Sequence, residues 1–289
     1  MHPISYLQAL VLGLLQGASE LFPVSSLGHS VILPRLLGWN IHQNDDYFLT
    51  FLVATHLATA IVLLGFFRRD WLRIIYGLGR SLRDREIGRD DTDAKLGWLL
   101  IIGTIPAGLL GLTLEHPLRA AFASATSASI FLLCNGLMLF AAELLRRHAP
   151  VRQGAEYSDE RIARQLDFKD TIGVGAAQAI ALLPGFSRSG AAMSGGLLVG
   201  LSNEDAARFS FLLATPIIGA AAALKLPELF GSAGDGVRGP ALVGALGAAV
   251  TAYLAVRFLV RFFETNRLTP FAVYCTAAGA ALTLYFALA

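Results

Sequence analysis

The chain has 289 residues, of which 55% are hydrophobic and only 15% are charged, and its mean hydropathy is +0.58. A soluble domain carries roughly 25% charged residues, so this composition excludes an ordinary soluble protein and indicates an integral membrane protein. The net charge of +2 is small. No basic stripe with interleaved aromatic residues indicates a nucleic-acid partner.

Six apolar runs are long enough to predict membrane-spanning helices. In chain order they cover residues 48–67, 98–114, 123–145, 209–224, 240–260 and 268–288. Each is near the roughly 20 residues that a helix needs to cross the hydrocarbon core, and the second and fourth runs are the short ones. We therefore predict an all-α polytopic membrane protein that forms a single integral domain over residues 1–289.

Lys and Arg are unevenly distributed between the connections. Residues 68–95 contain eight, 146–169 contain six and 257–267 contain three, whereas 115–122 contain one and 225–239 contain two. Connections rich in these residues tend to stay in the cytoplasm. We expect the first three segments on the cytoplasmic side and the N-terminus on the outer side.

Two polar segments interrupt the apolar sequence, and a proline lies in each. The first contains Gln16, Glu20, Pro23, Ser25, Ser26 and His29, and the second contains Pro184, Gly185, Ser187, Arg188 and Ser189. Proline disfavours helix continuation, and each apolar arm is too short to cross a bilayer alone. We therefore predict two re-entrant helix hairpins, one from each face, whose polar tips meet.

The two polar segments also resemble each other at an offset of 162 residues, where Gln16 falls on Gln178 and Ser25 on Ser187. Each half then contains one hairpin followed by three spanning helices. Because three is odd, the second half begins on the opposite face, which predicts an inverted-topology repeat with a site at the repeat interface. The predicted halves are residues 1–148 and 171–289, joined by a cytoplasmic loop over 149–170.

The side chains of the two tips suit a phosphate ligand. Arg188 carries a planar guanidinium that can contact phosphate with two hydrogen bonds. Ser187 and Ser189 lie at a Gly- and Ser-rich break before a helix, where free backbone N–H groups form an anion site. Ionisable groups at membrane depth are functional candidates by default.

The first tip adds groups for metal binding and acid–base chemistry. Glu20 is a ligand type for a hard divalent cation shared with substrate phosphates, and Gln16 lies one turn earlier on the same helix face. His29 is a candidate general acid or base. Ser26 or Ser25 is a candidate nucleophile if His29 lies within hydrogen-bond reach. Together these groups indicate phosphoryl transfer on a lipid-borne phosphate.

Structural interpretations remain open for several of these residues. Serines in membrane helices often bond to the backbone or to a neighbouring helix, and Glu20 with Arg188 is also compatible with a buried structural ion pair. His56, which lies in the middle of a predicted span, is expected to be a satisfied core residue, and the alternative is that it lines the cavity. Cys134 and Cys275 are expected to be small core residues and not a disulfide.

Both segments resemble motifs of the bacterial undecaprenyl-diphosphate phosphatases, the bacitracin resistance family. The first is similar to their (Glu/Gln)-x-x-x-Glu pattern followed by Pro-Val-Ser-Ser-x-Gly-His, and the second to their Pro-Gly-x-Ser-Arg-Ser pattern. The resemblance covers essentially the whole chain. It implies a multi-pass phosphatase of the bacterial cytoplasmic (inner) membrane, with inverted repeats and re-entrant hairpins. It also implies removal of the terminal phosphate of undecaprenyl diphosphate, which recycles the carrier lipid for peptidoglycan and cell-wall synthesis.

The resemblance also implies roles for individual residues. The catalytic set is Glu20, Ser26, His29 and Arg188; the phosphate-binding set is Ser25, Gly185, Ser187, Arg188 and Ser189; the metal ligands are Glu20 and Gln16. The cofactor is a divalent cation, Mg²⁺ or Ca²⁺, and the nucleophile is Ser26 or a metal-activated water. Two positions depart from the family pattern: Gln16 replaces a common Glu, and Ala192 replaces a common Thr.

We expect the active site to face the outer side, because the first hairpin enters the membrane from there. The expected partners are undecaprenyl diphosphate and membrane lipids, with a homodimer as an open option. The alternative from another functional class is a polyprenyl-phosphate transporter or flippase, since inverted repeats and broken helices are also typical of transporters.

Overall fold

The structure is a computed structural model that describes residues 4–41, 45–122, 124–146, 158–231 and 236–288. Within these ranges the secondary structure is entirely helical, apart from one isolated β-bridge between Pro184 and Phe186. The all-α prediction is therefore confirmed. Cys134 and Cys275 are both free; Cys275 is buried in the core as expected, whereas Cys134 is half-buried.

Six helices in the described ranges are long and apolar enough to cross a membrane. They are α3 (Asp46–Phe66), α5 (Thr92–Phe122), α6 (Ala125–Arg146), α10 (Asn203–Phe230), α11 (Arg238–Thr265) and α12 (Thr269–Leu288). This confirms the six predicted spans. The helices α5 and α10 extend well beyond the runs 98–114 and 209–224, because hydropathy marks the part of a helix that suits hydrocarbon and not its hydrogen-bonded ends.

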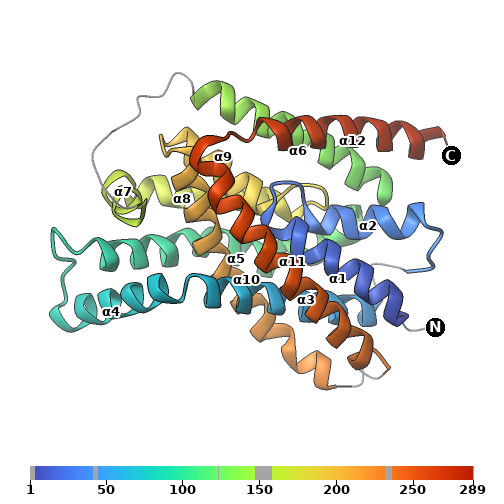
Figure 1. Cartoon of the computed structure of the whole chain (residues 1–289), viewed down its shortest axis with the longest axis horizontal. Coiled ribbons are helices and arrows are strands. Elements are labelled where there is room, and N and C mark those ends of the chain that lie inside the picture. The colour runs from blue at the N-terminus through green and yellow to red at the C-terminus, as the bar shows by residue number, and fades with distance from the viewer. Residues whose placement is uncertain (1–3, 42–44, 123, 147–157, 232–235, 289) are drawn as a thin grey trace.

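The two polar segments form helix–break–helix units. The first consists of α1 (Tyr6–Leu21) and α2 (Ser26–Leu36), and the second of α8 (Phe168–Gln178), a short 3₁₀ turn η1 (Ala179–Leu182) and α9 (Arg188–Leu198). Figure 1 shows α1 and α2 running side by side and turning in the middle of the molecule, with α8 and α9 turning there from the opposite end. The breaks occur at the predicted prolines and meet in the interior.

Two further helices lie outside the predicted spans. The helix α4 (Arg68–Asp84) directly follows α3, and α7 (Ser158–Gln165) lies in the segment 149–170 that was expected to be a loop. Residues 149–157 of that segment lie outside the described ranges. The sequence is helical at α7 because Ile162 and Ala163 are buried in the core on one side of this helix.

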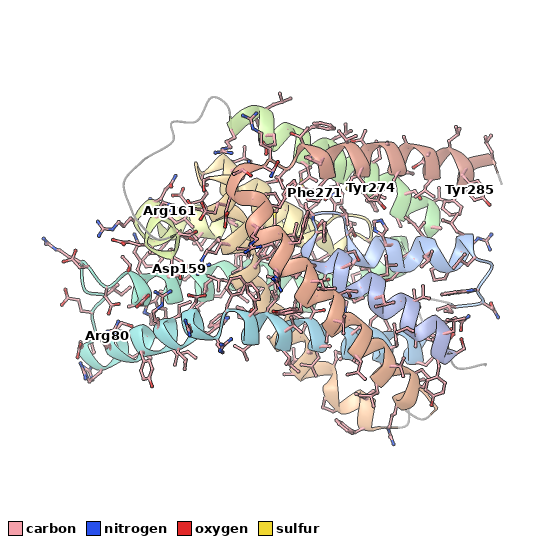
Figure 2. The ribbon with its side chains drawn as sticks, in the orientation of Figure 1. Arg80, Asp159, Arg161, Phe271, Tyr274 and Tyr285 are labelled. Carbon is pink, nitrogen blue, oxygen red and sulfur yellow. The ribbon has the colours of Figure 1, made fainter. Side chains whose placement is uncertain are left out.

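Ion pairs attach α7 to its neighbours at one end of the molecule. Asp159 of α7 accepts hydrogen bonds from Arg73 of α4 at 2.9 Å and from Arg208 of α10 at 3.1 Å. Arg161 donates to Asp205 of α10 at 2.8 Å. Figure 2 shows Asp159 and Arg161 together at this end. Buried carboxylates are tolerated when they are paired in this way, so the polar residues of α7 fix its position.

The first hairpin is anchored by close contact between α1 and α11. At Gly13 an added Cβ would fall on the carbonyl oxygen of Gly244, and at Gly17 it would fall on that of Ala248. Small residues four apart allow membrane helices to approach this closely. The position of α11 therefore determines the position of α1 and of the polar side chains at its end.

We predict that Gly13→Ala lowers the thermal stability of the protein in detergent, because the new methyl group must displace the Gly244 carbonyl. Such overpacking costs about 1–3 kcal/mol, and thermal unfolding followed by size-exclusion chromatography measures it. Gly65→Ala is the matched control, since Gly65 is a helical glycine with nothing within 4 Å of an added Cβ. Equal stability of the two variants would contradict the close contact.

Candidate active site

The breaks bring the first turns of α2 and α9 together in the interior. Ser25 caps α2, its hydroxyl accepting the Gly28 N–H at 3.1 Å, and Ser187 caps α9 by accepting the Gly190 N–H at 3.0 Å. Gly28 lies against Gly185 of the other break. The N-terminus of a helix attracts anions, so two 11-residue helices offer positive ends to one region.

Two hydroxyls of the second break contact the backbone of the first. Ser189 Oγ donates to the Phe22 carbonyl oxygen at 3.1 Å, Ser187 Oγ lies 3.5 Å from the same oxygen, and the two hydroxyls are 3.0 Å apart. Both serines are buried. These bonds hold the two breaks together, and the predicted phosphate contacts of Ser187 and Ser189 stay a prediction.

Gly185 has a backbone φ of +119°, a conformation that favours glycine. An added Cβ there would fall on the carbonyl oxygen of Ala128 in α6. The residue is therefore required for packing, and its expected contact with phosphate stays a prediction. Ala192, where the family pattern commonly has Thr, is buried in α9.

Glu20 is the meeting point of the two halves. Its Oε1 accepts from Arg188 Nη2 at 3.0 Å, and its Oε2 accepts from Ser26 Oγ at 2.6 Å and from Gln16 Nε2 at 3.1 Å. His56 Nε2 lies 3.4 Å from the same Oε2. The carboxylate is 7% exposed. One buried carboxylate therefore contacts four of the polar side chains around it.

His56 lies between a backbone carbonyl and the Glu20 carboxylate. Its Nδ1 lies 2.8 Å from the Leu52 carbonyl oxygen, and its Nε2 faces the carboxylate. Because carbonyl and carboxylate oxygens only accept hydrogen bonds, a ring protonated on both nitrogens would satisfy both contacts. A protonated His56 and Arg188 beside the one Glu20 carboxylate would give the cluster a net positive charge, which suits an anionic ligand.

Two buried polar atoms beside Glu20 have no hydrogen-bond partner in the described part of the chain. They are Nη1 of Arg188, a donor, and Oε1 of Gln16, an acceptor. An unsatisfied buried polar atom costs about 1–3 kcal/mol. A ligand that accepts from the guanidinium, such as a phosphate oxygen, would remove one of these costs, and a cation or a hydroxyl group would remove the other.

The donor set for a divalent cation is small. The described residues contain no group of three or more His, Cys, Asp and Glu side chains that could hold a metal. Glu20 and the free Oε1 of Gln16 are hard oxygen donors. Mg²⁺ is usually bound through one or two carboxylates and completes its shell with water and substrate phosphates. The residues therefore fit a cation that arrives with a phosphate ligand.

His29 points toward α12 and not toward Glu20. Its Nδ1 lies 2.6 Å from the Ser25 carbonyl oxygen and its Nε2 lies 2.8 Å from the Tyr274 hydroxyl. Figure 2 shows Tyr274 on α12. Since the carbonyl only accepts, Nδ1 carries a proton, and Nε2 is within hydrogen-bond distance of the Tyr274 hydroxyl. The hydroxyl of Ser26 donates to Glu20. The hydrogen-bond partner of this candidate nucleophile is therefore the Glu20 carboxylate and not His29.

Three residues at the site were not identified from the sequence. His56, expected to be a satisfied core residue or else to line the cavity, has partners at both ring nitrogens, and one of them is Glu20. Tyr274 contacts His29, and Asn135 of α6 contacts both breaks. A signal existed for His56 and Asn135, because each is a polar residue inside an apolar run. Tyr274 gave none, since tyrosine is common in membrane helices near the interface.

Known proteins match the chain over nearly its whole length. A family model described as bacitracin resistance protein BacA matches residues 9–281. The undecaprenyl-diphosphatase of Mycolicibacterium paratuberculosis is 50% identical over 303 residues, covering 99% of this chain and 98% of that protein. The undecaprenyl-diphosphatase 2 of Frankia alni is 45% identical over 345 residues and is matched over 100% of both chains. The undecaprenyl-diphosphatase 2 of Burkholderia thailandensis is 46% identical over 269 residues, covering 93% of this chain and 92% of that protein. The chain belongs to the bacitracin resistance protein BacA family.

Proposed function

We propose that this protein hydrolyses undecaprenyl diphosphate to undecaprenyl phosphate and inorganic phosphate, which recycles the carrier lipid for peptidoglycan and cell-wall synthesis. The names of its relatives support this substrate. The observation that carries the chemistry is the buried Glu20 carboxylate, which binds a serine hydroxyl from its own hairpin and an arginine from the other. Bacitracin resistance is the expected consequence of high activity, as the family description implies.

The terminal phosphate is proposed to bind between the first turns of α2 and α9. There it would accept from the free Nη1 of Arg188 and from backbone N–H groups at the helix ends. Ser25, Gly185, Ser187 and Ser189 form the backbone and hydroxyl surroundings of this position. Arg188 then neutralises the charge that develops on the phosphoryl oxygens, which is the main catalytic contribution in phosphoryl transfer.

Ser26 is proposed as the nucleophile. Its Oγ attacks the terminal phosphorus, the bond from that phosphorus to the bridging oxygen breaks, and undecaprenyl phosphate leaves. The hydroxyl proton moves to Glu20 Oε2, which already accepts it in a hydrogen bond of 2.6 Å. Water then hydrolyses the phosphoserine and releases inorganic phosphate. Direct attack by water is the alternative, and in that case Ser26 would only bind the phosphate.

His29 is proposed as a general acid or base for the second half of the reaction. Its Nε2 forms a hydrogen bond with the Tyr274 hydroxyl, and this bond holds the ring in one orientation. A divalent cation, Mg²⁺ or Ca²⁺, is proposed to bind with the substrate at Glu20 and Gln16. When bound, it would supply positive charge that polarises the phosphoryl group.

The proposed location is the bacterial cytoplasmic (inner) membrane, with the active site facing the outer side. The excess of Lys and Arg in residues 68–95 and 146–169 supports this orientation. The halves 1–148 and 171–289 are proposed to be inverted repeats, supported by the order of one broken helix pair before three spans in each. A homodimer is the proposed assembly. Light scattering of the protein in detergent tests this by measuring its molar mass.

We expect Glu20→Gln and Arg188→Ala each to reduce phosphate release from undecaprenyl diphosphate by at least about 100-fold, because each removes a charge that acts on the reacting group. Phosphate release by purified protein in detergent measures this. The matched control is Glu143→Gln, a buried glutamate of α6 that accepts the Leu268 N–H at 2.8 Å away from the breaks. Full activity of the Glu20 or Arg188 variant would refute the site. Lipid binding by the wild type without phosphate release would favour the transporter alternative.

A chelator is expected to abolish phosphate release, and added Mg²⁺ or Ca²⁺ to restore it. Gln16→Glu adds a second anionic oxygen beside Glu20, so half-maximal activity should need a lower cation concentration than in the wild type. Gln8→Glu, two turns earlier on α1, is the matched control and should leave the cation requirement unchanged. A cation requirement that is the same in all three proteins would contradict the metal-binding role of residue 16.

Cysteine labelling tests the orientation. In a background without Cys134 and Cys275, a single cysteine within residues 115–122 should react with a membrane-impermeant thiol reagent on intact cells. A single cysteine within residues 80–95 should react only after the cells are permeabilised. Labelling of the second position on intact cells would reverse the proposed topology.

A further inference from the structure

A single side-chain amide lies between the two breaks. Asn135 belongs to α6 and is fully buried, with 0% exposure. Its Nδ2 donates to the Pro23 carbonyl oxygen at 2.9 Å, and its Oδ1 accepts the Ser187 backbone N–H at 3.0 Å. One amide group thus joins Pro23, which lies 112 positions away in the chain, to Ser187, which lies 52 positions away.

The two backbone groups that Asn135 binds need such a partner. Both lie in non-helical backbone, where no turn of helix supplies a hydrogen bond, and lipid cannot replace one. One group is an acceptor and the other a donor. Because asparagine carries a donor and an acceptor on one planar amide, it can satisfy both at once. The identity of the partners also fixes which atom of the amide is nitrogen.

Asn135 is held in place by the packing of its own helix. At the neighbouring Gly136 an added Cβ would meet the Thr276 backbone, and at Gly279 it would meet the Leu133 backbone, so α6 and α12 are in close backbone contact. On another side, α6 contacts Gly185 of the second break through Ala128. The amide therefore belongs to a helix whose position is fixed by close packing.

The contact matters because the bound groups adjoin the reacting side chains. Pro23 follows Glu20 by three residues, and Ser187 directly precedes Arg188. The 3.0 Å contact between Glu20 and Arg188 requires that the two breaks keep their relative position. We propose that Asn135 is a positioning residue that fixes the two halves of the active site relative to each other. This inference rests on the proposed function of the Glu20 cluster.

The kinetic test compares Asn135→Leu with Asn203→Leu. Asn203 is also a buried asparagine that donates to a backbone carbonyl, that of Asn266, but it lies at the start of α10 outside the breaks. In Asn135→Leu every reacting group is present and misplaced, so kcat should fall about 10- to 100-fold while KM changes little. Asn203→Leu should keep the wild-type kcat.

Hydrogen–deuterium exchange gives a second readout that does not depend on activity. In Asn135→Leu, amides of residues 24–29 and 185–190 should exchange faster than in the wild type, while those of the α1 interior should not. In Asn203→Leu both segments should keep wild-type exchange. Asn135→Ala, which removes both hydrogen bonds without adding a bulky side chain, serves if the leucine variant does not fold. It should lose protection in the same two segments.

The outcomes separate the two proposals. A wild-type protein that releases no phosphate would refute the proposed function, and the exchange measurements would still decide whether Asn135 joins the breaks. Wild-type kcat and wild-type exchange in the Asn135 variants would refute the positioning role. Faster exchange with unchanged kcat would show that Asn135 supports the fold alone, which also overturns the proposal.

Discussion

The structure depends on the need to satisfy polar groups inside a membrane protein, where lipid supplies no hydrogen bonds. The two breaks and the Glu20 carboxylate lie in the interior, and each must find partners within the chain. Glu20 is therefore surrounded by polar side chains from four helices, and the Phe22 and Pro23 carbonyls accept from Ser189 and Asn135. The same bonds that make the breaks tolerable also bring the two halves of the site together.

The charged groups of the site favour binding of an anion. Glu20 is the one carboxylate in the contacts described for the cluster, and it faces the guanidinium of Arg188 and the imidazole of His56. The first turns of α2 and α9 add positive ends from the helix dipoles. The ion pair uses Nη2 of Arg188, while the buried Nη1 has no hydrogen-bond partner among the residues that the structure describes. The pairing of Glu20 with Arg188 thus orients the arginine without using up its capacity to bind phosphate.

Local sequence signals predicted the spans and the breaks, because apolar run length and proline act within a few residues. They did not predict the full lengths of α5 and α10 or the helix α7, whose position depends on ion pairs with α4 and α10. The motif residues Glu20, Ser26 and Arg188 could be named from their chemistry, and their meeting followed only from the suspected repeat. His56, Tyr274 and Asn135 could not be assigned, because their partners are distant in sequence and the contacts arise from packing.

The glycine contact between α1 and α11 has a consequence for motion. Two backbones in direct contact cannot slide past each other without collision, so the end of α1 that carries Glu20 is fixed to the scaffold. Arg188 reaches Glu20 from α9, which is joined to the first hairpin through side-chain hydrogen bonds that can break and re-form. The second hairpin is also in close backbone contact with its neighbours, because an added Cβ at Gly175 of α8 would fall on the Gly103 carbonyl oxygen and one at Gly185 on that of Ala128. A lipid head group must therefore reach the site between two hairpins that are each fixed to the surrounding helices.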